Sequence, residues 1–189
     1  MRKIVILLLL SLISINSFSQ TSSGVELTKK EKKALKKAEQ AKQDSLNAIA
    51  FKATLESKQW VLEAYQVSFN NGRSFNVTPT LNFIAIEGEE AFIQIGSMSA
   101  YGYNGVGGIT VKGRVSKYTD KVTNKYGSRF ISIVVNSPNG TFDIRINVNS
   151  SGEMATATVQ GATTGGELKY SGKIVPLNES TVYKGRPIF

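Results

Sequence analysis

The sequence predicts an all-β domain preceded by one helix, the domain being an antiparallel β-sandwich or a flattened barrel of about nine strands. Three observations support this fold class. From Gln59 onward, apolar residues recur with a period of two in short segments. Clusters of Gly, Pro, Asn and Ser separate these segments. No helical pattern lies between them, which excludes the crossover helices of an α/β fold.

Residues 1–19 have the features of a secretory signal peptide. Two basic residues come first, an apolar run extends from Ile4 to Ile13, and small residues follow at Ser17 and Ser19. The run is too short to span about 30 Å of hydrocarbon. The chain has no cysteine that could carry a lipid anchor. We therefore expect an exported protein, periplasmic or cell-surface or secreted, without a transmembrane anchor.

After a linker over residues 20–27, residues 28–58 predict a lysine-rich helix. Thr28 and Glu31 have the spacing of a capping box. The residues that follow are mostly strong helix formers, without Gly or Pro. The second half of this helix carries apolar residues at helical spacing, which predicts a face that docks on the sheet. These residues are Leu46, Ile49, Ala50, Ala53 and Leu55.

The first half of the predicted helix holds six lysines between Lys29 and Lys37. One interpretation is a contact with anionic lipid or a cell-surface polymer, and the other is a solvated extension. The solvated extension is favoured, because a membrane-surface helix would carry bulky apolar residues opposite its charges and this one carries alanines.

The net charge of +9 is unevenly distributed along the chain. The helical segment has nine Lys against four acidic residues, whereas the chain from Gln59 onward has twelve Lys and Arg against nine Asp and Glu. The β domain is therefore nearly balanced in charge, and nucleic acid is not an expected partner.

Residues 59–189 form the predicted β domain. Its nine expected strands are Trp60–Val67, Ser74–Val77, Leu81–Ile86, Ala91–Ile95, Ile109–Tyr118, Arg129–Asn136, Thr141–Val148, Glu153–Gln160 and Leu168–Val175. The segments FIAI, AFIQI and ISIVV are apolar on both faces and need cover on both sides. The Leu46–Leu55 face of the helix or a dimer partner could supply that cover.

The segment Tyr101–Val115 packs five glycines and two tyrosines between strand-like segments. It is no phosphate loop, because neither a GK[ST] motif nor a helix follows it. The glycines either permit close strand crossing and a bulge at Gly113, or they open the edge of a ligand site beside flat tyrosine faces. The candidate ligand-binding residues are Tyr101, Tyr103, Asn104, Gly105, Gly107 and Gly108.

Catalytic residues are scarce in this sequence. The chain has no Cys and no His, which excludes thiol nucleophiles, imidazole or thiolate metal ligands and a Ser-His-Asp triad. The acidic turn Glu87–Glu90 lacks the spacing of a calcium loop and is interpreted as a solvated hairpin tip. Asp120 falls in a predicted polar loop, Thr119–Ser128, with nothing convergent. Trp60 is expected to plug the core against the helix. We expect a non-enzymatic protein without metal or cofactor.

Several short motifs together resemble one family of exported bacterial proteins, domain of unknown function 4251. They are WVLEAYQV, Val77, Asn82-Phe83-Ile84, Gln94, Gly105–Gly113, Phe142-Asp143-Ile144 and Tyr183-Lys184-Gly185. The resemblance covers the chain from about Lys52 to its end. It implies a β domain behind a signal peptide and a lysine-rich helix, in the periplasm or at the surface of Bacteroidetes-type bacteria. The family is uncharacterised, so the resemblance assigns no functional residue.

Two functions remain open from the sequence. The leading prediction is an exported β domain that binds a small apolar or amphipathic ligand, or a cell-envelope partner, near Tyr101–Gly108. The alternative is a structural or assembly protein that forms homo-oligomers, such as a homodimer, through its apolar strands and N-terminal helix.

Overall fold

The computed structural model describes residues 28–96, 108–161 and 166–187. The chain forms two compact units, Met1–Glu39 and Gln40–Phe189, and all strands belong to the second. Helix α2 (Lys29–Ser57) begins in the first unit and ends in the second. At its start Glu31 Oε2 accepts hydrogen bonds from the Thr28 amide (2.8 Å) and hydroxyl (2.9 Å), which confirms the capping box.

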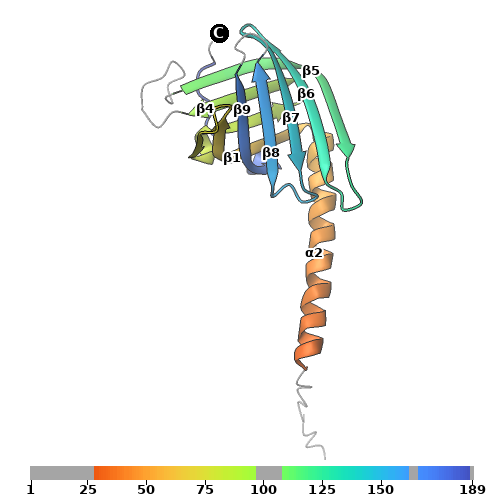
Figure 1. The fold of residues 1–189 in the computed structure, drawn as a ribbon. Coiled ribbons are helices and arrows are strands. Elements are labelled where there is room, and N and C mark those ends of the chain that lie inside the picture. The colour runs from red at the N-terminus through yellow and green to blue at the C-terminus, as the bar shows by residue number, and fades with distance from the viewer. Residues whose placement is uncertain (1–27, 97–107, 162–165, 188–189) are drawn as a thin grey trace, which may run out of the picture. The chain divides into compact units, whose positions relative to one another are not determined.

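The described part of the second unit contains nine antiparallel strands in one sheet (Figure 1). They are β1 (Gln59–Phe69), β2 (Ser74–Asn76), β3 (Phe83–Glu87), β4 (Glu90–Gly96), β5 (Gly108–Val122), β6 (Arg129–Ser137), β7 (Gly140–Val148), β8 (Ala155–Gly161) and β9 (Glu167–Pro176). Two short 3-10 turns, η1 (Pro79–Leu81) and η2 (Leu177–Glu179), precede β3 and follow β9.

Pairing between β1 and β9 closes eight of these strands into a barrel. The ninth strand, β2, pairs with the second half of β1, while β3 pairs with its first half. The fold is therefore a flattened barrel of about nine strands, as the sequence predicts. The expected strand at Leu81 begins two residues later, because Pro79 starts a 3-10 turn there.

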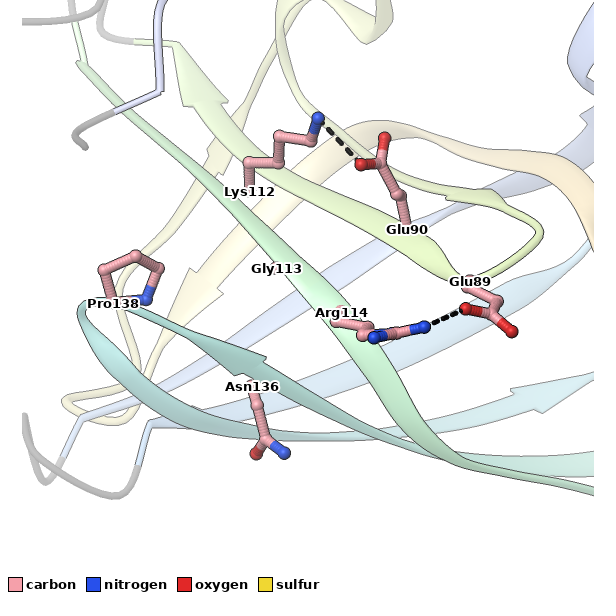
Figure 2. Close-up of a pocket in the computed structure, with 7 residues that line it drawn as sticks. All are labelled: Glu89, Glu90, Lys112, Gly113, Arg114, Asn136 and Pro138. Carbon is pink, nitrogen blue, oxygen red and sulfur yellow. Dashed lines mark hydrogen bonds and ion pairs between the residues drawn. The ribbon is translucent and has the colours of Figure 1, made fainter.

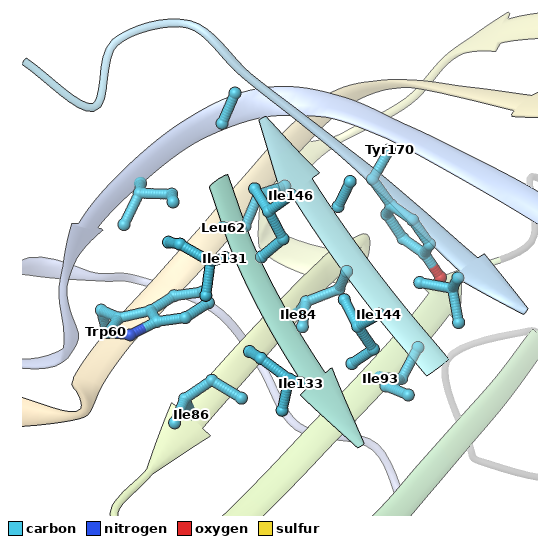
Figure 3. Packing of buried hydrophobic residues seen from close by; sticks show 14 of the residues in the cluster. Trp60, Leu62, Ile84, Ile86, Ile93, Ile131, Ile133, Ile144, Ile146 and Tyr170 are labelled. Atoms are coloured by element: carbon cyan, nitrogen blue, oxygen red, sulfur yellow. The ribbon is translucent and has the colours of Figure 1, made fainter. Parts of the chain in front are cut away.

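The interior of the barrel is filled by side chains that alternate with outward-facing ones along every strand. Figure 3 shows the centre of this cluster. Its large members, each fully buried, are Trp60, Leu62, Ile84, Ile86, Ile131, Ile133, Ile144, Ile146 and Tyr170. Because these side chains occupy the middle of the barrel, a ligand has access only to an end or to the outer surface.

One end of the barrel is sealed by the last turns of α2, and we call it the helix end. Phe51 and Leu55 are buried in the same cluster as the strand residues. Trp60 Nε1 donates to the Tyr118 hydroxyl (3.3 Å), which lies 3.5 Å from the Leu55 carbonyl oxygen. Burial raises the pKa of Tyr118 to about 12. Trp60 is thus the core plug that the sequence predicts.

The docking face of α2 differs from the predicted one. Of the five predicted residues only Leu55 is buried; Leu46 and Ile49 are 52% and 68% exposed, and Ala50 and Ala53 are exposed. The contact comes instead from Phe51, which lies beside Gly152 of the loop between β7 and β8. The prediction was right for Leu55 and wrong for the other four residues, because Phe51, on the side of the helix opposite Leu46 and Ile49, enters the barrel beside Leu55.

The outer face of β1, β3 and β4 is covered by the chain's own C-terminal segment. Four residues on this face form a second buried cluster: Val61, Phe83, Ala85 and Phe92. Val175, Leu177 and Val182 pack against it. We call residues 177–187 the C-terminal strap. It provides the second cover that the two-sided strands FIAI and AFIQI require, in place of the predicted helix face or dimer partner.

Gly113 is not the site of a bulge. The register of β5 is regular through Gly113 and shifts between Val115 and Lys117. An added Cβ at Gly113 would lie 2.6 Å from Val135 Cγ1 and 2.7 Å from the Asn136 carbonyl oxygen. This glycine therefore allows β5 and β6 to approach closely, the other role predicted for the glycines of this segment.

The docking face of α2 can be tested by two truncations. Phe51→Ala should lower the free energy of unfolding by about 3–5 kcal/mol, because it empties a buried aromatic site. Ile49→Ala, on the exposed face, should change it by less than about 0.5 kcal/mol. Chemical denaturation of both variants measures the difference. Equal losses of unfolding free energy in the two variants would show that Phe51 is not the main docking residue of α2.

Candidate functional site

The end of the barrel away from the last turns of α2 carries apolar side chains that are exposed in the described part of the chain. At this distal end β1 finishes at Phe69, where β2 and the start of β9 pair with it, and β5 begins at Gly108 beside the end of β4. Phe75 is opposite the buried Val67, so both side chains lie on the interior face of the sheet. Phe69 and Ile109 share that face, because each is two residues from a core residue. We call Phe69, Phe75 and Ile109 the distal mouth.

The three distal-mouth side chains are unusually accessible for interior positions. Phe69 is 40% exposed, Phe75 is 45% exposed and Ile109 is 54% exposed. The rings of Phe69 and Phe75 make an edge-to-face contact with centroids 5.9 Å apart. Grouped apolar side chains that remain in water are typical of binding sites. These exposed apolar side chains are therefore the candidate site at this end of the barrel.

The candidate residues from the sequence belong to this end of the barrel as far as the structure describes them. Gly108 is the first residue of β5, pairs with Gly96 at the end of β4 and directly precedes Ile109. Tyr101, Tyr103, Asn104, Gly105 and Gly107 lie outside the described residues. Sequence reasoning missed Phe69 and Phe75, because the exposure of a strand-end aromatic depends on where the barrel ends.

Gln94 is a buried polar residue that ties the C-terminal strap to the barrel. It lies on the outer face of β4 and is fully buried. Its amide nitrogen donates to the carbonyl oxygens of Leu81 (3.1 Å) and Tyr183 (2.9 Å). Its side-chain oxygen accepts from the Thr110 hydroxyl (2.9 Å) and the Gly185 amide (2.8 Å). The four hydrogen bonds satisfy the whole side-chain amide, as burial requires.

Further polar contacts hold the strap along its length. The Tyr183 amide donates to the Thr80 carbonyl oxygen (2.9 Å), and the Ser180 hydroxyl donates to Glu63 Oε1 (2.7 Å). Lys184 pairs with Glu87 and lies over the Phe92 ring, 4.5 Å from its centroid. These contacts assign the strap a structural role.

The acidic turn Glu87–Glu90 is engaged in ion pairs. Glu89 pairs with Arg114, Glu90 with Lys112 (2.9 Å), and Glu87 with Lys184. Figure 2 shows the first two of these pairs at the edge of an open hollow of about 460 Å³. The Arg114 contact lowers the pKa of Glu89, which keeps that carboxylate ionised. In the described part of the chain, no group of three His, Cys, Asp or Glu residues could hold a metal ion.

Asp120 has a partner that the sequence does not reveal. It lies in β5, not in the predicted loop, and accepts hydrogen bonds from Arg129 Nε (2.8 Å) and Nη2 (2.6 Å). Both side chains are only 15% exposed. The carboxylate raises the pKa of Arg129. The predicted strand ended at Tyr118, whereas β5 continues to Val122. The prediction stopped too early because a charged residue, Asp120, occupies an inward-facing position where the pattern required an apolar one.

Comparison with known proteins identifies the family. The model of a domain of unknown function, DUF4251, matches residues 39–174. The chain belongs to the DUF4251 family. A solved structure of a DUF4251 family protein from Bacteroides eggerthii DSM 20697 is 31% identical, with a TM-score of 0.60, and the match covers 71% of this chain and 91% of that one. No curated protein matches the chain. Membership of DUF4251 thus confirms the resemblance seen in the sequence and assigns no activity.

No helix among the described residues is long and apolar enough to cross a bilayer. The polar side-chain atoms buried in the described part of this DUF4251 protein all have hydrogen-bond partners. Its charged side chains at the hollow and at the helix end are likewise paired. Among the apolar side chains that stay exposed in the described residues, Phe69, Phe75 and Ile109 are those on the interior face at the distal end.

Replacing Gln94 should release the strap. Gln94→Leu keeps the approximate volume but leaves buried groups of Leu81, Tyr183 and Gly185 unpaired, so we expect a loss of about 2–4 kcal/mol in unfolding free energy. Hydrogen exchange of the strap amides should accelerate. Arg186→Gln, at an exposed strap position, is the control and should change neither quantity. If the Gly185 amide of Gln94→Leu kept its protection from hydrogen exchange, Gln94 would not be the residue that holds the strap.

Proposed function

We propose that this protein is an exported, non-enzymatic β-barrel that binds a small apolar or amphipathic ligand at its distal mouth. The observation that carries the proposal is the exposure of Phe69, Phe75 and Ile109 on the interior face at the open end. The filled interior directs binding to this end, and α2 seals the other.

The other parts of the proposal rest on the sequence. The signal peptide over residues 1–19 supports export to the periplasm or cell surface. The absence of Cys and His, together with the ion pairing of Asp120 and Glu89, supports binding in place of catalysis. Tyr101 and Tyr103 are included in the proposal as the sequence predicts them, since they precede Gly108 and Ile109 in the chain.

Native mass spectrometry of the protein purified from its own host tests whether a small molecule is retained. A fluorescently labelled fatty acid then serves as the probe for titrations. Phe75→Ser and Ile109→Ser should each weaken its binding by about 10- to 100-fold, since each removes one apolar side chain from the contact. The double variant Tyr101→Ala/Tyr103→Ala should weaken it as well.

The matched control for these substitutions is Ile49→Ser on α2, which removes an exposed apolar side chain away from the mouth. It should leave binding unchanged. Equal affinity of all variants would refute the distal site, and thermal unfolding of each variant ensures that the comparison is made on folded protein.

A second candidate function is the assembly of homo-oligomers, and a separate observation favours it. Leu46, Ile49 and Ala53 lie along one exposed face of α2, opposite the docked Phe51. This face could pair with the same face of a second copy. The outer faces of FIAI and AFIQI are not part of the proposed oligomer contact, because the C-terminal strap covers them.

For the assembly hypothesis, light scattering over a wide concentration range should show a dimer or higher oligomer. Leu46→Glu and Ile49→Glu should each shift the population to monomer, because each places a charge in the apolar contact. Phe75→Ser, at the other end of the barrel, should not. A monomer at every concentration would rule out assembly through this face.

A further inference from the structure

The first three turns of α2 carry a dense cluster of positive charge. We call its members the lysine cluster: Lys29, Lys30, Lys32, Lys33, Lys36 and Lys37. All six side chains are exposed. They belong to a described helix with a formed cap, so their spacing is fixed by helical geometry.

The lysine cluster is not neutralised within the described part of the chain. None of the six ammonium groups forms an ion pair there, and the ion pair within α2 joins Lys52 to Glu56, farther along the helix. Glu31 lies among these lysines, but its carboxylate accepts hydrogen bonds from the backbone and side chain of Thr28. Those contacts lower the pKa of Glu31 and direct its charge to the helix start.

The six lysines lie on one side of the helix. At 3.6 residues per turn they fall within roughly 160° of the circumference. Ala34, Leu35, Ala38 and Ala41 fill the opposite side. Pairs such as Lys29–Lys33 and Lys33–Lys37 place like charges one turn apart, which destabilises an isolated helix. An anionic surface on this side would remove that repulsion.

The shape of the cluster favours a planar anionic surface over a flexible or helical polyanion. The six cations cover roughly 160° of one side of the helix, and their long, flexible side chains can reach a plane on that side. The β domain is nearly balanced in charge, with twelve basic against nine acidic residues, whereas the lysine cluster places six cations together. The opposite side, with three alanines and the single bulky residue Leu35, argues against insertion into hydrocarbon. It does not argue against electrostatic adsorption, which lysine clusters of this size achieve at anionic headgroups.

We propose that the lysine cluster of α2 docks electrostatically on the headgroups of an anionic lipid bilayer. The helix adsorbs without insertion, and attraction to lipid phosphates replaces the mutual repulsion of the lysines. This proposal uses none of the distal-mouth residues. A negative result for ligand binding at the mouth would therefore leave it unaffected.

Vesicle co-sedimentation tests the proposal, with the chain from Gln20 onward and vesicles of phosphatidylcholine with or without phosphatidylglycerol. We expect binding only to vesicles that contain phosphatidylglycerol, with affinity falling steeply as salt is added. The triple variant Lys32→Gln/Lys33→Gln/Lys36→Gln should bind roughly 100-fold more weakly, about fivefold for each lysine. Glutamine is also a strong helix former, so the helix is retained.

A charge-matched control separates the cluster from overall charge. Lys117→Gln/Lys121→Gln/Lys125→Gln removes three exposed lysines from β5 and the loop after it, and should keep affinity within about twofold. Equal losses in the two triple variants would overturn the assignment to α2. Equal binding to neutral vesicles would overturn the electrostatic mechanism. Binding to soluble heparin without binding to vesicles would assign the cluster to a polymer and overturn the bilayer proposal.

Discussion

The closure of the barrel depends on one position without a side chain. β1 and β9 pair along most of their length, and the register shifts between Ala64 and Gln66. Opposite this irregularity stands Gly172, where an added Cβ would lie 2.0 Å from the Glu63 carbonyl oxygen. No rotamer change can relieve a clash with backbone. The β1–β9 pairing that turns the sheet into a barrel therefore requires glycine here, and every feature of the interior follows from that closure.

Closure also determines how the two ends of the barrel differ. At the helix end, Phe51 and Leu55 complete the core, and Tyr118 connects the indole of Trp60 to the end of α2. At the distal end, the interior face finishes in Phe69, Phe75 and Ile109, which are left half exposed. A barrel of this size has no free lumen once Trp60 and Tyr170 are inside, so the core leaves no room for a ligand within it.

The fold was predictable from the sequence because its signals are local. Alternating apolar residues and turn residues such as Asn71-Gly72 are sufficient to place each strand to within a few residues. Contacts between distant segments were not predictable. Neither the choice of Phe51 over Ile49 as the docking residue nor the pairing of Asp120 with Arg129 has a local signature. The distal mouth was not predictable either. In the sequence Phe69 and Phe75 look like ordinary strand residues, and their exposure depends on where the barrel ends.

The residues that carry the family resemblance can now be given physical roles. Gln94 and Tyr183-Lys184-Gly185 are two halves of one clamp, joined by hydrogen bonds from Gln94 to Tyr183 and Gly185. Asn82 donates to the Thr78 carbonyl oxygen and accepts from the Gly96 amide, which holds η1 against the end of β4. Each of these contacts ties an irregular segment to the barrel wall. They account for membership of a common fold without implying a common ligand.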